Sequence, residues 1–115
     1  MEGNAISAVT THVLDTSRGR PARGIPVRLE ALEPQPRVLA EATTDEDGRV
    51  PELGPDRVEP GSYRLVYDTA AYHAAQGETG FFPEVTITFT ITDPAQHYHV
   101  PVLLSPFAYS TYRGS

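Results

Sequence analysis

Strict alternation of apolar and polar residues is the feature that most limits what this chain can fold into. In residues 85–92 every second residue is Thr, and the residues between them are Val, Ile, Phe and Ile. Side chains of a β-strand point alternately to its two faces, so this pattern predicts a strand with one face buried and the other exposed. Similar alternation recurs in residues 25–31 and 63–67. These runs predict an all-β protein.

Turn-forming residues separate these runs. They cluster in residues 19–24, 33–36, 47–48 and 60–61. We expect Asp47 and Gly48 to close a tight hairpin between residues 40–44 and 49–50. Only residues 69–76 have a helical composition, with Thr69 as the N-cap and Gly77 after the end. Closely spaced strands with one short helix predict a two-sheet β-sandwich of seven to eight strands.

Length and composition narrow the class of protein further. A chain of 115 residues has the size of one compact domain, so we expect a single domain over residues 1–115. The net charge of -6 argues against nucleic-acid binding. The absence of cysteine excludes disulfides and thiolate chemistry. No segment approaches the roughly 20 apolar residues of a membrane span, and the start lacks a signal-peptide pattern, so we expect a cytoplasmic protein that does not bind membranes.

Three of the four histidines share an orientation on predicted strands. In residues 97–104, His97 and His99 lie in one phase of the alternation. The opposite phase suits a core and contains Tyr98, Val100, Val102 and Leu104. His12 shares its phase with Ile6, Ala8 and Thr10. We therefore expect these histidines on an outer sheet face, where His12 and His99 meet if their strands lie in one sheet in a suitable register.

The histidine spacing by itself is compatible with two kinds of site. A His-x-His pair on a strand, joined by His12, matches a zinc site made of three imidazoles. A metal-free acid–base site uses the same residues. We favour the metal-free site, because no clear fourth ligand is present and a nearby arginine would repel the metal ion. Taken singly, an exposed histidine on a sheet is most often an ordinary surface residue.

Arg49 and the C-terminal hydroxyls offer further chemistry. The guanidinium of Arg49, next to the predicted hairpin turn, has a fork of donors that suits an anionic or carbonyl-rich ligand. Considered alone, however, Arg49 is better explained as an exposed residue paired with Asp45 or Glu46. Hydroxyl groups are frequent in residues 109–115, but a serine nucleophile has weak support, because no Gly-x-Ser-x-Gly motif is present.

Taken together, several segments resemble the transthyretin-related 5-hydroxyisourate hydrolases, in order and over essentially the whole chain. The segments are residues 10–15 (TTHVLD), 24–27 (GIPV), Thr44 with 47–49 (DGR), 81–85 (FFPEV), 97–101 (HYHVP) and 112–115 (YRGS). The terminal YRGS is the most specific of these, because the hormone-carrier branch, transthyretin proper, lacks that ending. The resemblance implies a transthyretin-like sandwich assembled as a homotetramer, with its sites at the dimer–dimer interface.

The resemblance also implies an activity and a set of site residues. The reaction is hydrolysis of 5-hydroxyisourate to 2-oxo-4-hydroxy-4-carboxy-5-ureidoimidazoline in urate degradation, without a cofactor or a metal. The family's catalytic residues match His12, Arg49 and His99. Its terminal tetrapeptide matches Tyr112, Arg113, Gly114 and Ser115, which we expect to bind substrate together with His97.

A mechanistic hypothesis follows from these matches. His12 and His99 would activate water and exchange a proton, Arg49 would stabilise the oxyanion, and the C-terminal segment would close the site. The alternative is a non-enzymatic carrier that holds an aromatic ligand in the channel between subunits. The convergence of several polar groups weighs against a carrier of hydrophobic ligands.

Overall fold

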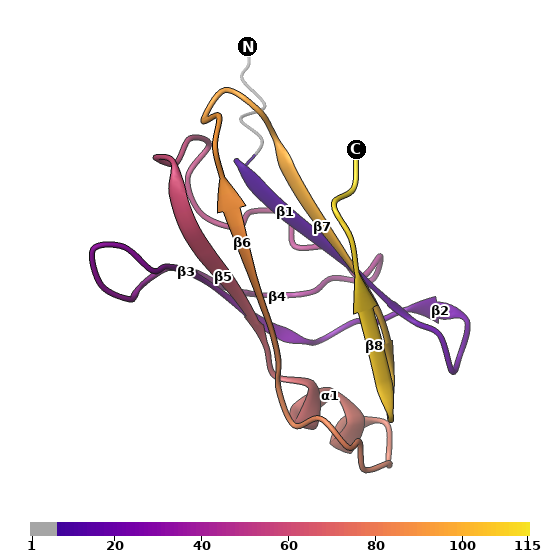
Figure 1. The fold of residues 1–115 in the computed structure, drawn as a ribbon. Helices are drawn as coiled ribbons and strands as arrows, with labels where there is room; N and C mark the ends of the chain where they lie inside the picture. The colour runs from indigo at the N-terminus through magenta and orange to yellow at the C-terminus, as the bar shows by residue number, and fades with distance from the viewer. Residues whose placement is uncertain (1–6) are drawn as a thin grey trace.

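The structure is a computed structural model that describes residues 7–115, and it consists of two four-stranded β-sheets and one short helix (Figure 1). The elements are β1 (Val9–Asp15), β2 (Arg20–Pro21), β3 (Pro26–Ala31), β4 (Arg37–Thr43), β5 (Gly61–Tyr67), α1 (Thr69–Ala75), β6 (Val85–Ile91), β7 (Tyr98–Ser105) and β8 (Ala108–Thr111). The prediction of an all-β sandwich of seven to eight strands with one helix is confirmed.

The two sheets differ in how their strands pair. The first sheet has the order β2-β1-β7-β8, and the second has the order β4-β3-β5-β6. Strands β1 and β7 form the centre of the first sheet and run parallel, whereas all the other pairs are antiparallel. In Figure 1 the indigo β1 and the orange β7 lie side by side. This pairing brings the histidines from both ends of the sequence onto one sheet.

The alternation in the sequence sorts residues between core and surface as predicted. In β7, Tyr98, Val100, Val102 and Leu104 are buried against the second sheet, while His99 is only half-buried on the opposite face. In β1 the residues of the core phase are Val9, Thr11, Val13 and Asp15, and all are buried. His12 and Thr10 are half-buried on the outer face. Ile6, which the sequence assigns to this phase, lies outside the described residues.

The helix is where predicted, but its N-cap is different. Helix α1 covers Thr69–Ala75, and Asp68 is its N-cap, because the Asp68 carboxylate accepts a hydrogen bond from the Ala71 N–H at 3.0 Å. The expected cap, Thr69, instead donates its hydroxyl proton to the Phe82 carbonyl at 2.6 Å. Within residues 7–115, no helix is long and apolar enough to cross a membrane.

The turn at Asp47 and Gly48 forms, but the predicted hairpin ladder is wrong. The Asp45 N–H donates to the Arg49 carbonyl at 2.7 Å, which closes the turn. The returning segment then leaves the second sheet, and Arg49 forms an isolated antiparallel bridge with His12 of β1. Residues 49–50 do not continue the ladder of β4, which pairs only with β3 in the described part of the chain. The crossing carries Arg49 to the sheet that holds the histidines.

Candidate active site

A cavity of about 390 Å³, lined by both polar and apolar residues, lies on the outer face of the first sheet. Four segments that are distant in the sequence contribute to it: β1, the turn after β4, the start of β7 and the C-terminus. Its lining residues are Thr10, Thr11, Asp45, Arg49, Val50, Pro51, His97, His99 and Ser115. Five of the eight predicted site residues lie in it or against it, namely Arg49, His97, His99, Gly114 and Ser115.

The register of the parallel pair places Thr10 directly beside His99. The Thr10 hydroxyl lies 2.8 Å from His99 Nδ1 and 2.8 Å from His97 Nε2, so it bridges the two imidazoles. Sequence reasoning missed this role of Thr10. The sequence did contain one indication of this role: in the alternation of β1, Thr10 lies on the same outer face as His12.

His12 lies on the same sheet face as His99, as predicted, but two residue pairs further along the parallel ladder. Its register partner in β7 is Pro101 rather than His99. His12 is absent from the residues that line the cavity, and within residues 7–115 no hydrogen bond joins it to His99. It is held instead by the backbone bridge to Arg49. His12 therefore adjoins the arginine more closely than the bridged histidine pair.

Gly48 brings Arg49 to this face. The Gly48 carbonyl accepts a hydrogen bond from the Val13 N–H at 2.8 Å, and its φ of 74° is in the left-handed region. A Cβ at this position would lie 2.4 Å from the Val13 carbonyl oxygen, so only glycine allows the turn to approach β1 this closely. The predicted Asp47-Gly48 turn thus serves to dock Arg49 onto the histidine sheet.

The Arg49 guanidinium is not paired as an ordinary hairpin arginine would be. The Asp45 carboxylate accepts the backbone N–H groups of Asp47 and Arg49 at 2.9 and 3.0 Å. Within residues 7–115, the guanidinium itself makes no ion pair or hydrogen bond, with Asp45, Glu46 or any other residue. No described residue therefore occupies the donors that Arg49 could offer to a ligand in the cavity.

The C-terminal tetrapeptide divides between two locations. The Gly114 N–H donates to the His99 carbonyl at 2.8 Å, and Ser115 lines the cavity. Arg113 turns away, stacks over the Tyr98 ring at 4.4 Å and donates to the Gln96 side chain at 3.0 Å. Tyr112 lines a second cavity of about 300 Å³ on the flank between β6 and β7. Gly114 and Ser115 adjoin the cavity that holds Arg49, whereas Tyr112 and Arg113 line the second cavity, which His99 also borders, and Arg113 donates to the His97 carbonyl at 3.4 Å.

Gly114 has a specific steric reason to be glycine. A Cβ added there would lie 2.6 Å from His99 Cδ2 and 3.1 Å from Pro101 Cγ. Contacts below 3.0 Å require the neighbour to move, so any larger residue would displace either the terminal segment or the imidazole. The His99 ring is therefore held between the Thr10 hydroxyl at Nδ1 and the Gly114 backbone at Cδ2.

The environment of His99 favours its neutral form. Partial burial lowers the pKa of His99 below the usual 6.5, and the positive charge of Arg49 lowers it further, with smaller contributions from His97 and His12. A neutral imidazole at neutral pH accepts a proton through its free nitrogen. The site therefore combines a proton acceptor with an unpaired guanidinium.

The zinc alternative needs several ligating side chains around one point. Among residues 7–115, no group of three or more His, Cys, Asp or Glu side chains has an arrangement that could hold a metal ion. The two paired histidines instead direct Nε2 of His97 and Nδ1 of His99 at the Thr10 hydroxyl. The observed contacts are those of a hydrogen-bonded site.

Comparison with known proteins assigns the chain to a family. The HIUase/Transthyretin family profile matches residues 9–114. The 5-hydroxyisourate hydrolase of Mus musculus is 48% identical over 113 residues, which cover 95% of this chain and 96% of the mouse protein. The structure of Klebsiella pneumoniae 5-hydroxyisourate hydrolase has a TM-score of 0.82 and 37% identity, covering 93% of this chain and 98% of that chain.

A hormone carrier is also similar in structure. Sea bream transthyretin in complex with thyroxine has a TM-score of 0.85 but only 27% identity, covering 93% of this chain and 94% of that chain. The fold and the outer-face site define a transthyretin-like β-sandwich. The chain belongs to the HIUase/Transthyretin family, and the similar hydrolases are more identical to it than this carrier is.

Proposed function

We propose that this protein is a hydrolase that opens the six-membered ring of 5-hydroxyisourate, giving 2-oxo-4-hydroxy-4-carboxy-5-ureidoimidazoline in urate degradation. The relatives named 5-hydroxyisourate hydrolase, at 37–48% identity over nearly the whole chain, support this substrate. The observation that carries the proposal is the pairing of a neutral, half-buried His99 with an unpaired Arg49 in one cavity. A cavity of about 390 Å³ is within the size range of small-molecule sites.

His99 acts as the general base in this proposal. Hydrolysis of the amide-like ring C–N bond needs an activated water, stabilisation of charge on the carbonyl oxygen and a proton for the departing nitrogen. Because its pKa is lowered, His99 is unprotonated at neutral pH and takes a proton from the attacking water. The resulting imidazolium can return the proton to the nitrogen that leaves.

Arg49 stabilises the charge that develops during attack. Its guanidinium has no partner within residues 7–115, so the carbonyl oxygen of the substrate does not compete with a resident carboxylate. His12, bridged to Arg49 through the backbone, is the second catalytic histidine of the proposal. It supports the charged intermediate from a position two residue pairs further along the sheet. No cofactor or metal takes part.

The C-terminal segment binds the substrate and limits access of water. Ser115 lines the cavity, while Gly114 adjoins the His99 ring. Tyr112 is 60% exposed and Arg113 points toward Gln96, so both reach substrate only at a site completed by another subunit. His97 binds indirectly, through the Thr10 hydroxyl.

A homotetramer with its sites at the dimer–dimer interface completes the proposal. Strands β6 and β8 are the edges of their sheets, and free edges pair readily with another chain. Large apolar side chains are exposed along this flank, namely Phe81, Phe107, Tyr109 and Tyr112. A second copy that extends both sheets would cover these groups, and the outer face with the histidines would then meet another dimer. Light scattering that finds a stable monomer would contradict this assembly.

The proposal also includes the domain organisation and the cellular location of the protein. Residues 1–115 act as one hydrolase domain, since the family profile extends from residue 9 to residue 114. The enzyme works in the cytoplasm, as the sequence leads us to expect. Fractionation of the producing cells that recovers the protein outside the cytoplasm would contradict this location.

The test is a kinetic assay with freshly made substrate. Urate oxidase generates 5-hydroxyisourate from urate in the cuvette, and its ultraviolet decay is followed with and without this protein. The spontaneous rate is the blank. We expect a large acceleration that depends on protein concentration and is lost in His99→Ala. If the folded protein gives only the blank rate, the hydrolase proposal fails, and the carrier alternative should then be tested by binding of an aromatic ligand.

A further inference from the structure

The hydrogen bonds of Thr10 carry information about the protonation of the two histidines beside it. Its hydroxyl lies 2.8 Å from a nitrogen of each ring, and the distances are equal. Within residues 7–115, no other hydrogen-bond partner of this hydroxyl is found. A threonine hydroxyl has one proton and two lone pairs, so it can donate to only one of the two nitrogens.

This arrangement couples the tautomers of the two neutral imidazoles. If Thr10 donates to His97 Nε2, the proton of His97 is on Nδ1, and Thr10 then accepts from the Nδ1–H of His99. If Thr10 donates to His99 Nδ1, both rings instead carry their protons on Nε2. In both cases Thr10 donates one hydrogen bond and accepts the other. The two neutral histidines then carry their proton on the same ring nitrogen, which means that they have the same tautomer.

The charges around His99 select one of the two arrangements. Its Nδ1 faces Thr10 and its Cδ2 edge faces Gly114, so Nε2 is the ring nitrogen that does not contact Thr10, and the ring borders both the cavity that holds Arg49 and the cavity beside Tyr112. Arg49 lines the first of these cavities, and a positive charge favours a ring nitrogen that presents its lone pair. This favours the arrangement in which both rings carry their proton on Nδ1.

We propose that Thr10 is a positioning residue that holds His99 as the Nδ1–H tautomer, with the Nε2 lone pair directed into the cavity, by donating its own proton to His97 Nε2. This inference rests on the proposed function, in which His99 is the base. His97 thereby acquires a role as the acceptor that orients the Thr10 hydroxyl. When Nε2 takes a proton from water, the Nδ1–H bond to Thr10 stays in place, so the bridge needs no rearrangement.

Other titratable or charged groups surround this bridge and must be kept constant between variants. They are His12 from β1, and Asp45 and Arg49 from the turn after β4. None of them is altered in the Thr10 variants that are compared below. A difference between variants in the tautomers or the rate therefore reports on the Thr10 hydroxyl.

The first measurement is a tautomer assignment that does not depend on activity. The chain has four histidines, so ¹⁵N-histidine labelling gives a small set of ring signals, which single His→Gln variants assign. Above the imidazole pKa range, one-bond and long-range ¹H–¹⁵N correlations distinguish protonated from unprotonated ring nitrogens. We expect Nδ1–H for both His97 and His99 in the wild-type protein. Opposite tautomers, or Nε2–H on His99, would overturn the proposal.

The second measurement compares variants at Thr10. In Thr10→Val the hydroxyl is replaced by a methyl group of similar shape, so we expect the shared tautomer to be lost and kcat/KM to fall roughly tenfold, as for one net hydrogen bond. Thr10→Ser keeps the hydroxyl and should restore both readouts. Thr16→Val is the matched control, because Thr16 donates only to the Leu104 carbonyl, 3.2 Å away and outside the cavity.

The outcomes separate this inference from the proposed function. Wild-type tautomers and kinetics in Thr10→Val would overturn the positioning role while leaving the hydrolase intact. If the wild-type protein does not accelerate substrate decay, the proposed function fails, whatever the tautomers are. Thermal unfolding of each variant shows that the comparison is made on folded protein. A rate loss in Thr10→Val that Thr10→Ser does not restore would also contradict the role of the hydroxyl.

Discussion

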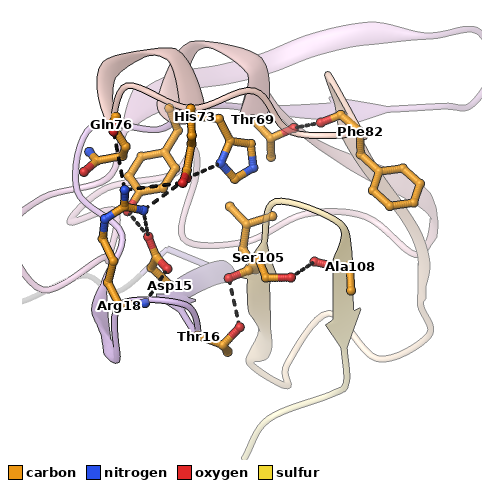
Figure 2. Close-up of polar contacts among 12 residues, drawn as sticks. Asp15, Thr16, Arg18, Thr69, His73, Gln76, Phe82, Ser105 and Ala108 are labelled. Atoms are coloured by element: carbon orange, nitrogen blue, oxygen red, sulfur yellow. Dashed lines mark hydrogen bonds and ion pairs between the residues drawn. The ribbon is translucent and has the colours of Figure 1, made fainter.

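Two histidine-containing polar clusters of this molecule differ in how completely their groups are paired. Figure 2 shows the first, which joins α1 to the end of β1. There His73 is buried and its Nδ1 lies 3.1 Å from the Glu78 carboxylate, which also accepts a hydrogen bond from Arg18 at 3.0 Å. Buried Asp15 accepts the Tyr72 hydroxyl at 2.6 Å and the Arg18 guanidinium at 3.2 Å. Every charge in this cluster has an opposite partner.

The candidate active site has similar residue types but lacks this compensation. In the described part of the chain, no carboxylate is hydrogen-bonded to His97, His99 or the Arg49 guanidinium. Full pairing in the first cluster fixes a helix to a strand, whereas incomplete pairing in the second leaves donors and acceptors for a substrate. Local saturation of hydrogen bonds, rather than residue type, therefore distinguishes a structural histidine from a reactive one in this protein.

The largest expected effect tests the two histidines with the same substitution. His99→Gln should lower kcat/KM for 5-hydroxyisourate by about 10²–10⁴, the usual contribution of a positioned acid–base group, with little change in thermal stability. His73→Gln should do the opposite, lowering the melting temperature and leaving kcat/KM near the wild-type value. The assays are urate-oxidase-coupled kinetics and thermal unfolding. If the two variants behave alike, the distinction between the clusters is wrong.

The next effect concerns the stability of the paired cluster. Tyr72→Phe removes the hydroxyl that donates to buried Asp15 and should lower the free energy of unfolding by about 1.5–3 kcal/mol, as for a hydrogen bond to a charged group. Denaturant unfolding measures this change. Unchanged stability would show that the cluster does not hold α1 to β1.

The same variant should also alter how stability depends on pH. Burial by itself raises the pKa of Asp15, but hydrogen bonds from Tyr72 and Arg18 outweigh it and hold the pKa below the usual 3.8. Because the folded-state pKa is lowered, the contribution of Asp15 is present above its ordinary pKa and is lost as the pH falls through the folded-state value. Tyr72→Phe should therefore lose less stability than the wild-type protein on acidification below about pH 4.

A smaller effect tests the steric support of the open site. Gly114→Ala places a Cβ 2.6 Å from His99 Cδ2, so the ring or the terminal segment must move. We expect kcat/KM to fall by roughly tenfold through a weakened contact with Thr10, with little loss of stability, because the segment is at the surface. Steady-state kinetics give the result. Gly19→Ala is a useful comparison, since nothing lies within 4 Å of an added Cβ there, although its φ of 66° causes local strain. Wild-type kinetics for Gly114→Ala would remove the terminal segment from the support of His99.

The smallest effect is a change of protonation in the open site. Burial and the Arg49 charge both lower the pKa of His99, so Arg49→Met should move that pKa upward toward the ordinary imidazole value. A histidine NMR titration measures this without substrate. The ring signals of His73, in the other cluster, should be the same in both proteins and are the internal control. A downward shift of the His99 pKa would show that Arg49 does not act on it electrostatically.

Several features could be predicted from the sequence because their cause is local. Alternation in residues 85–92 and 97–104 placed both strands and assigned the histidines to the outer face, as the burial of Val100 and Val102 confirms. The helix was found from its alanines and Gly77. Its cap was missed because Asp68 and Thr69 are adjacent residues of similar capping propensity, and only the backbone path shows which carboxylate or hydroxyl meets the Ala71 N–H.

The composition of the site depended on contacts that no local pattern encodes. The partnership of Thr10 with His97 and His99 follows from the parallel register of β1 and β7, two strands from opposite ends of the chain. Asp47 and Gly48 predicted that Arg49 would pair with the strand before the turn. Instead the chain leaves the second sheet after the turn, and Arg49 pairs with His12 of β1. In both cases the register is chosen by the packing of the whole core.

The sequence by itself therefore determined the strands, the faces of their side chains and the residues able to carry acid–base chemistry, because the period of a strand and the pKa range of a side chain are properties of short segments. Only the tertiary structure decided which of these residues touch. It placed one hydroxyl between two imidazoles and, within residues 7–115, left the Arg49 guanidinium without a partner, because strand register and chain crossing are set by the burial of many distant residues together.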